Sequence, residues 1–201
     1  MPPLKMIVGL GNPGKEYERT RHNVGMNWLN RLADSYGARF KENPKLKAWL
    51  ASASIEDVEC LLLRPSTYMN QSGISLRLVS DYFQIALGDT LVVHDEMAFS
   101  PGVVKLKSGG GANGHNGLRS LFSELGNERE FYRLRIGVGH PGDSRMVTPY
   151  LTKNKIPIEE QQAMDESTNF SSNLIKEIVN GCWDRAMNKL HGQNLTNQEQ
   201  P

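Results

Sequence analysis

Apolar and polar positions along this chain alternate in blocks that predict strands and helices in turn. The first apolar run, Leu4 and Met6–Val8, has the length and composition of a buried strand. After His22, apolar residues recur four positions apart, which predicts an amphipathic helix that Gly37 ends. The positions that carry this period are Val24, Trp28, Leu32 and Tyr36.

The alternation continues through the rest of the sequence. Further strands are predicted at Lys47–Ile55, Val58–Arg64, Thr90–Val93, Val103–Lys107 and Phe131–Val138. Further helices are predicted at Ile74–Phe83, Leu118–Leu125, Ile158–Asn180 and Cys182–His191. This order predicts a single-domain α/β fold over residues 1–191, a three-layer sandwich with a mixed, twisted central sheet flanked by helices. The Gln- and Asn-rich segment 192–201 is predicted to be a disordered polar tail.

Composition narrows the class of protein. The 201 residues suffice for one sizeable core, and two cysteines are too few for a disulfide framework, which favours a reducing, cytoplasmic location. No apolar run is long enough to span a membrane, and no signal-peptide pattern follows Met1. A net charge of +1 does not by itself indicate a nucleic-acid-binding protein, so only a local basic patch would do so.

The segment Gly9–Gly14 matches the spacing G-x-G-x-x-G of dinucleotide-binding loops. That function requires a helix that opens inside the glycines, so that its amides reach the pyrophosphate. Here Pro13 lacks an amide hydrogen, and the helical period begins only near His22. A nicotinamide- or flavin-dependent oxidoreductase therefore remains an alternative, which a thermal-shift titration with those cofactors tests.

Polar side chains follow several of the predicted strands. They are Asn12, His22, the pair Met69-Asn70 and Asp95, with Asn116 in a glycine-rich loop. Any one of them alone is typical of a turn or a helix cap. Because the carboxyl ends of parallel strands share one edge of a sheet, together they predict a functional site.

The residue types in this group restrict its chemistry. The sequence has no G-x-S-x-G, H-E-x-x-H or C-x-x-C motif, and its glycine loop lacks the lysine of a phosphate-binding P-loop. His94, Asp95 and His115 match no recognised metal-binding spacing. A histidine, a carboxylate and several neutral amides suit hydrolysis by an activated water, of an activated ester rather than a peptide bond.

Five segments, in order and spacing, resemble the bacterial peptidyl-tRNA hydrolase family over about Lys5 to His191. They are Gly9–Gly14 with Thr20–Asn23, Thr67–Gly73, His94–Glu96, Gly109–Gly117 and Arg133–Gly142. The resemblance implies a monomeric α/β enzyme without cofactor or metal. It also implies the reaction, cleavage of the ester between the peptide and the tRNA 3′ end, which recycles tRNA from aborted translation.

The resemblance also implies roles for individual residues. His22 matches the general base and Asp95 its carboxylate partner. Substrate-binding positions of the family are matched by Asn12, Tyr17, Met69, Asn70 and Asn116, and tRNA-binding positions by Lys105, Lys107 and Arg135. Met97–Ser100 departs from the family, in which an Asp is common two residues after the Asp-Glu pair.

A non-catalytic RNA-binding protein is the other alternative, since chloroplast relatives of this fold act in RNA splicing. Such a protein would keep the cleft but not the turnover. The presence of His22, Asp95 and all three asparagines argues against it.

Overall fold

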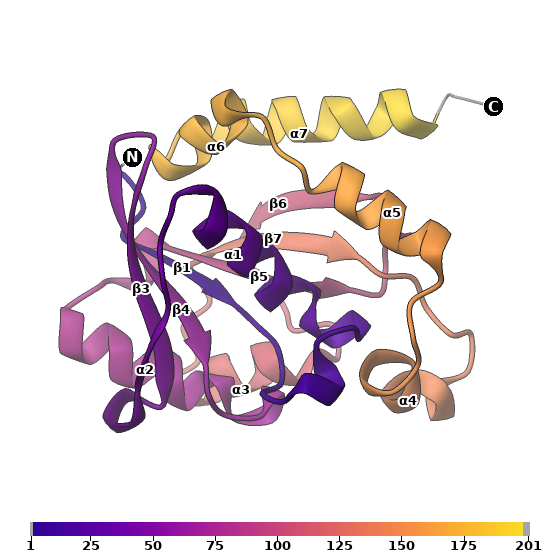
Figure 1. Ribbon diagram of the computed structural model, residues 1–201, viewed down its shortest axis with the longest axis horizontal. Helices are drawn as coiled ribbons and strands as arrows, with labels where there is room; N and C mark the ends of the chain where they lie inside the picture. The colour runs from indigo at the N-terminus through magenta and orange to yellow at the C-terminus, as the bar shows by residue number, and fades with distance from the viewer. Residues whose placement is uncertain (1, 199–201) are drawn as a thin grey trace.

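A computed structural model of the chain describes residues 2–198 and builds them around one mixed sheet (Figure 1). The strand order is β2-β3-β4-β1-β5-β7-β6. The central strands β4, β1, β5 and β7 run parallel, whereas β2, β3 and β6 are added by antiparallel pairing. The strands are β1 Met6–Gly9, β2 Lys41–Asn43, β3 Ala48–Ile55, β4 Val58–Pro65, β5 Thr90–Glu96, β6 Val104–Ser108 and β7 Tyr132–Gly137.

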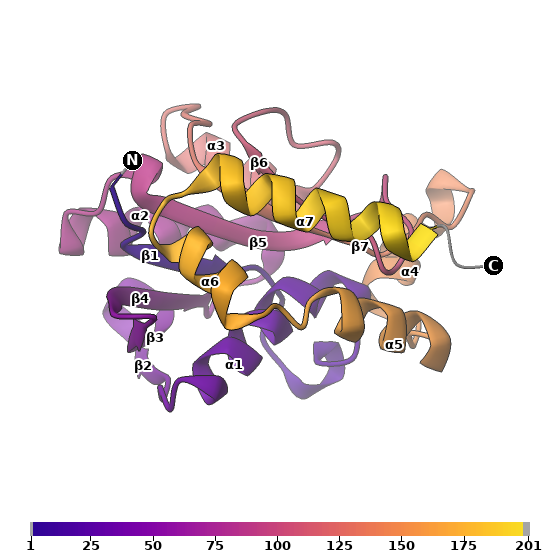
Figure 2. The same ribbon diagram turned by 90° about the horizontal axis from the view of Figure 1, so that it is seen from above.

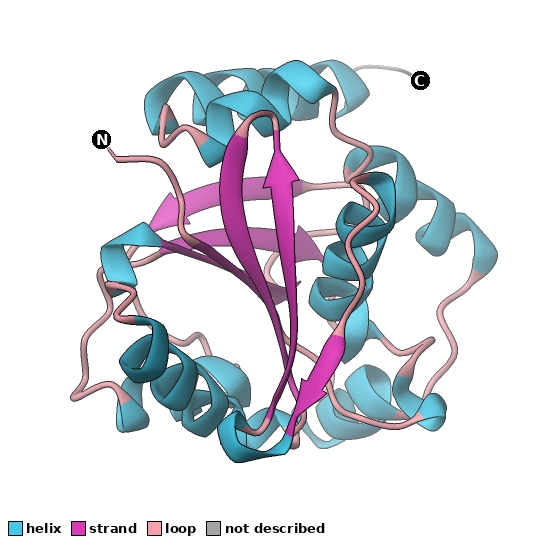
Figure 3. Ribbon diagram, turned by 60° about the vertical axis from the view of Figure 1, so that its left-hand side comes forward, coloured by secondary structure: helices cyan, strands magenta, loops and turns pink. Residues whose placement is uncertain are grey.

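Helices cover both faces of this sheet (Figures 2 and 3). They are α1 Val24–Ser35, α2 Ser72–Phe83, α3 Asn116–Glu124, α4 Val147–Thr152, α5 Ile158–Ser167, α6 Ser172–Val179 and α7 Trp183–Gln198. One apolar core lies between the sheet and α1, α5, α6 and α7, and the other lies between the sheet and α2 and α3. Ile7 belongs to the first core and its neighbours Met6 and Val8 to the second, so β1 is apolar on both faces.

Two glycines allow close contacts that bring the polar segments together. A Cβ at Gly25 would collide with the carbonyl of Val93, so α1 begins against β5. A Cβ at Gly73 would collide with the carbonyl of Ser120, so α2 begins against α3. The residues just before α1 and α2 therefore lie near the end of β5 and the start of α3.

The predicted α/β sandwich is confirmed, and most predicted elements lie within a few residues of those observed. The helix predicted over Ile158–Asn180 is wrong, because it is divided into α5 and α6 by a break at which the Ser171 hydroxyl accepts from the Leu174 amide. The short elements β2 and α4 were not predicted, because their sequences show no hydrophobic periodicity. No helix within residues 2–198 is long and apolar enough to cross a bilayer.

The predicted disordered tail also differs from the structure. α7 continues past His191 to Gln198, so residues 192–198 are helical. No proline interrupts this stretch, so the backbone hydrogen bonds of α7 can continue through it. The last part of the prediction, residues 199–201, lies outside the described residues.

Candidate active site

The loops after β1 and β4 are joined by the side chain of Asn12. Its Oδ1 accepts a hydrogen bond from the Met69 amide at 2.8 Å. Asn23 fixes the backbone of Asn12 from the other side, since its Oδ1 accepts from the Asn12 amide at 2.8 Å and its Nδ2 donates to the Asn12 carbonyl at 2.9 Å. The Nδ2 of Asn12 has no partner among the described residues and stays available as a donor.

His22 and Asp95 form a buried pair. His22 lies in the short 3-10 turn Arg21–Asn23 that precedes α1, and Asp95 lies near the end of β5. The Nδ1 of His22 is 2.9 Å from Oδ1 and 3.0 Å from Oδ2 of Asp95. A carboxylate only accepts, so Nδ1 carries the proton and Nε2 of the neutral ring is an acceptor. This is the arrangement that a general base requires.

A second histidine, His115, which the sequence did not place in the site, contacts the same carboxylate. Its Nε2 is 2.8 Å from Oδ1 of Asp95. Its Nδ1 accepts from the amides of Gly117 and Leu118, at 3.1 and 3.3 Å, and so caps α3. Because Nδ1 accepts, the proton of the neutral ring is on Nε2, which donates to Asp95. In the sequence, His115 was considered only with His94 and Asp95 as a metal ligand, and its position just before a predicted helix was the other available signal.

These contacts shift the pKa values of the buried groups. Burial lowers the pKa of His22, but the charge of Asp95 and its hydrogen bond to the ring outweigh burial and leave that pKa above 6.5. Burial raises the pKa of Asp95, but His22 and His115 together hold it well below its usual value. Burial and the neighbouring His115 lower the pKa of His94 to about 3. His94 therefore stays neutral, whereas the pKa of His22 lies above that of a free histidine.

The group of His22, Asp95 and His115 also has the composition of a metal site, with candidate ligand atoms within 4.8 Å of one another. Ligand atoms on a tetrahedral zinc ion are about 3.4 Å apart, given metal–ligand distances near 2.1 Å. Here each imidazole nitrogen that faces Asp95 lies 2.8–2.9 Å from its oxygen, a hydrogen-bond distance. These distances are typical of hydrogen bonds rather than of ligand atoms around one metal ion.

A small cavity of about 90 Å³ opens beside this pair. His22, Asp95, His115 and Asn116 line it together with the glycine-rich loop and α4. Asn116 is exposed here, at the first position of α3. The structure therefore brings the predicted base, its carboxylate and one predicted amide to a single solvent-accessible space.

The other predicted substrate-binding residues form a second group outside this cavity. Met69 is buried, and its sulfur lies against Gly117 at the start of α3. Asn70 is exposed on the turn that follows Met69. Tyr17 meets the exposed ring of Tyr68 edge-on, with centroids 6.3 Å apart. No contact among the described residues joins Asn70 or Tyr17 directly to His22.

The predicted tRNA-binding cations lie on the antiparallel pair β6 and β7. Lys105 is opposite Arg135, and Lys107 is opposite Arg133. Arg135 is compensated by Glu96 at 2.9 Å. Phe99, from the segment that departs from the family, lies beneath two of the cations, with its ring centroid 4.8 Å from Nζ of Lys105 and 4.5 Å from the Arg135 guanidinium.

Arg133, which sequence reasoning missed, has a different position. It is buried and donates to the carbonyls of Gly110 and Gly111 at 2.5 and 2.7 Å. Burial, with the nearby Arg135 and Arg129, lowers its pKa to about 10, so it remains cationic at neutral pH. It anchors the glycine-rich loop that leads to His115 and Asn116.

Comparison with known proteins gives one consistent result. The sequence model of the peptidyl-tRNA hydrolase family matches residues 6–199. Peptidyl-tRNA hydrolase of Pseudomonas aeruginosa is 45% identical over 96% of this chain and 99% of that protein. Its counterpart in Teredinibacter turnerae is 43% identical over 94% of this chain and 97% of that protein. The crystal structure of the Acinetobacter baumannii peptidyl-tRNA hydrolase superposes with a TM-score of 0.89 and 43% identity, over 93% of this chain and 94% of that one.

Proposed function

Because the chain belongs to the peptidyl-tRNA hydrolase family, we propose that it hydrolyses peptidyl-tRNA with His22 as a metal-independent general base. The bond cleaved is the ester between the peptide and the tRNA 3′ end. The observation that carries the role of His22 is its Nδ1 contact with Asp95, 2.9 Å long, beside the 90 Å³ cavity. That contact holds the ring in the tautomer whose Nε2 accepts a proton.

The reaction follows from these positions. Nε2 of His22 takes a proton from a water molecule as the water oxygen attacks the ester carbonyl. Asp95 stabilises the imidazolium that forms. The carbonyl oxygen gains negative charge, and the side-chain amide of Asn116 donates a hydrogen bond to it. The carbonyl then re-forms, the ribose oxygen of the tRNA leaves, and His22 returns its proton to that oxygen.

The remaining predicted residues are proposed to hold the substrate. Nδ2 of Asn12 and the amide of Asn70 are donors for the peptide and the terminal adenosine. Met69 and Tyr17 supply apolar and aromatic surface beside them. We also propose that the protein acts as a cytoplasmic monomer, which light scattering on the purified protein tests for its oligomeric state.

Release of peptide from purified peptidyl-tRNA tests the proposed function. We expect cleavage of a peptidyl-tRNA whose amino terminus is blocked, and little cleavage of unblocked aminoacyl-tRNA. Binding of peptidyl-tRNA without release would favour the non-catalytic RNA-binding protein instead. Treatment with a chelator is expected to leave the rate unchanged, and a loss restored by zinc would contradict the metal-independent mechanism.

His115 is proposed to position Asp95, and two substitutions separate this role from its role as a helix cap. Asn caps helices well but is too short to reach Asp95, whereas Ala does neither. We expect both His115→Asn and His115→Ala to lower kcat about tenfold, the cost of one hydrogen bond to a charged group. With one donor fewer, the Asp95 charge acts more strongly on His22, so the acid limb of the pH–rate profile should move to higher pH. A wild-type kcat in His115→Asn would mean that His115 acts only as the helix cap and does not position Asp95.

Lys107 is proposed to contact a tRNA phosphate. Loss of one phosphate contact lowers the slope of log affinity against log salt by about 0.7–0.9. We expect Lys107→Ala to weaken binding of full-length peptidyl-tRNA and to flatten its salt dependence by this amount. Cleavage of a minimal peptidyl-adenosine ester should change little, since that substrate lacks the distant phosphates.

The control for Lys107 is Lys45→Ala, an exposed lysine that follows β2 at the other edge of the sheet. It should leave both substrates unaffected. An equal loss of cleavage of both substrates in Lys107→Ala would mean that Lys107 stabilises the cleft itself rather than contacting a phosphate.

A further inference from the structure

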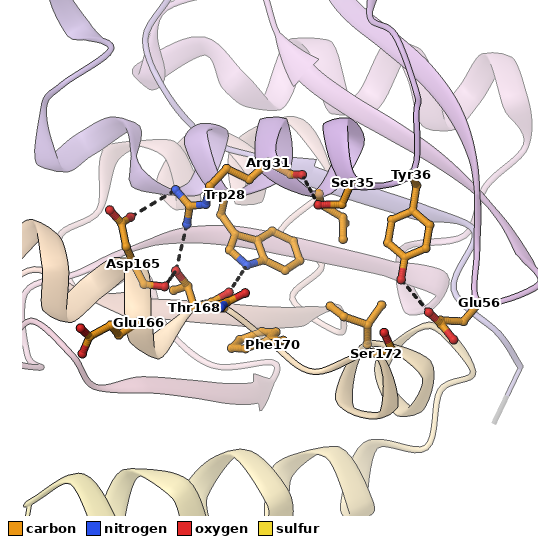
Figure 4. Close-up of a pocket in the computed structure, with 13 residues that line it drawn as sticks. Trp28, Arg31, Ser35, Tyr36, Glu56, Asp165, Glu166, Thr168, Phe170 and Ser172 are labelled. Atoms are coloured by element: carbon orange, nitrogen blue, oxygen red, sulfur yellow. Dashed lines mark hydrogen bonds and ion pairs between the residues drawn. The ribbon is translucent and has the colours of Figure 1, made fainter.

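A second cavity, of about 740 Å³, lies along α1 and shares no lining residue with the catalytic cavity (Figure 4). Its walls come from α1, the turn between β3 and β4, and the segment from the end of α5 into α6. Nothing in the proposed hydrolysis uses it. Its volume is in the range of sites that bind ligands.

The floor of this groove is aromatic and apolar. The rings of Trp28 and Phe170 lie 5.9 Å apart between centroids, with buried Leu32 and Ile175 beside them. The indole Nε1 of Trp28 already donates to the Thr168 carbonyl at 3.2 Å. Trp28 is 4% exposed, so the ring surface open to a ligand comes mainly from the half-buried Phe170. With the indole donor already engaged, this surface suits an apolar side chain.

The rim of the groove carries a surplus of negative charge. It has three carboxylates, Glu56, Asp165 and Glu166, and one cation, Arg31. Arg31 is already engaged, since it donates to the Thr168 hydroxyl at 2.9 Å and lies 3.4 Å from Asp165.

Two of the three carboxylates lack a cation. Glu56 accepts from the Tyr36 hydroxyl at 2.8 Å, and neither Glu56 nor Glu166 pairs with a cation among the described residues. The pKa of Tyr36 is raised to about 12 by burial together with this contact with Glu56. The rim can therefore accept two positive charges.

The two unpaired carboxylates lie at opposite ends of the aromatic floor (Figure 4). Glu166 lies beyond Trp28 at one end, and Glu56 lies beyond Tyr36 at the other. Trp28 and Tyr36 are eight residues apart, which corresponds to about 12 Å along a helix. Two residues four positions apart in an extended peptide are separated by about 13 Å, whereas in a helix they are about 6 Å apart.

We propose that this groove binds an extended basic segment of a protein partner, in which two Lys or Arg residues four positions apart flank an apolar residue. The apolar side chain packs on Trp28 and Phe170, and the two cations pair with Glu56 and Glu166. A phosphate backbone is excluded by the same carboxylates. The cations proposed for tRNA are on β6 and β7 and none of them lines the groove.

The probe is the acetylated and amidated peptide Lys-Ser-Leu-Ser-Lys, titrated into the ¹⁵N-labelled full-length protein. We expect saturable shifts of the Trp28 indole N–H and of the Thr168 and Phe170 amides, with a Kd below about 1 mM. The amides of His22 and Asn116 should not move. Replacing both Lys by Glu, or Leu by Ser, should abolish the shifts. Shifts centred elsewhere, or the same shifts with the Glu peptide, would overturn the proposal.

Substitutions in the protein provide the second part of the test. We expect Glu56→Gln combined with Glu166→Gln to weaken binding of the Lys peptide about three- to tenfold, the effect of losing two exposed ion pairs. Glu59→Gln, an exposed carboxylate on the same hairpin outside the groove, is the matched control and should bind as wild type. Peptidyl-tRNA cleavage should be unchanged in both variant proteins. Equal peptide affinity in the double variant and in wild type would refute the proposed pairing.

Discussion

His22→Ala should lower kcat on peptidyl-tRNA by about 10²- to 10⁴-fold, the usual contribution of a general base. The loss belongs in kcat, because the ring acts on the attacking water rather than on the bound tRNA. Affinity for tRNA should stay close to wild type, since His22 is 5% exposed and faces Asp95 rather than the cations of β6 and β7.

The pH dependence of the wild-type enzyme gives an independent measurement of the same group. Only unprotonated His22 can accept a proton from water, so activity is lost as the pH falls through its pKa. Because Asp95 raises that pKa above 6.5, the acid limb should lie above the value of a free histidine. A rate that is flat from pH 8 to pH 5 would contradict a histidine base.

The control for His22→Ala is His191→Ala, which removes a histidine of α7 that contacts the Leu106 amide. Its kcat should be close to wild type. Unchanged kcat in His22→Ala itself would end the assignment of the base.

Local patterns were sufficient to predict the strands and a group of polar residues at one edge of the sheet, whereas the pairing of His22 with Asp95 was implied by the family resemblance. The apolar run at Met6–Val8 marks a strand buried on both faces, and polar residues at strand exits meet wherever those strands are parallel. The break between α5 and α6 was not predicted, although Thr168, Asn169 and Ser171 are residue types that favour helix ends and caps over helix interiors. The order of the strands depends on pairing between distant segments and came from the structure.

The missed residues have roles that depend on contacts across the chain. The proton on Nε2 of His115 follows from two helix amides on one side and Asp95 on the other. Arg133 and Arg135 are two residues apart on β7 and lie on the same face of the strand. Arg133 is nevertheless buried, because it donates to carbonyls of the glycine-rich loop, and its role as an anchor depends on that distant loop. The acidic groove was not visible in the sequence, since Trp28, Glu56 and Glu166 belong to three separate segments.

Asp95→Asn should be the most damaging conservative change in the site, with a loss of about 10³- to 10⁴-fold in kcat. Oδ1 of Asp95 accepts from both His22 and His115, and Oδ2 is 3.0 Å from Nδ1 of His22. If the side-chain oxygen of the introduced Asn takes the place of Oδ1, its NH₂ group takes the place of Oδ2. The NH₂ group then points at the Nδ1 proton of His22. That repulsion favours the tautomer with its proton on Nε2, which cannot act as a base.

The same substitution should also change the pH profile, and the sign distinguishes it from simple misfolding. Burial lowers the pKa of His22, and the charge of Asp95 is what raises it above 6.5. Without that charge, the pKa should fall below 6.5, and the acid limb of the residual activity should move to lower pH. Asp89→Asn removes a carboxylate that pairs with Lys5 just before β5, and it should leave both kcat and the acid limb as in wild type. An acid limb in Asp95→Asn that stays at the wild-type pH would show that the ionisation that limits the rate does not belong to His22.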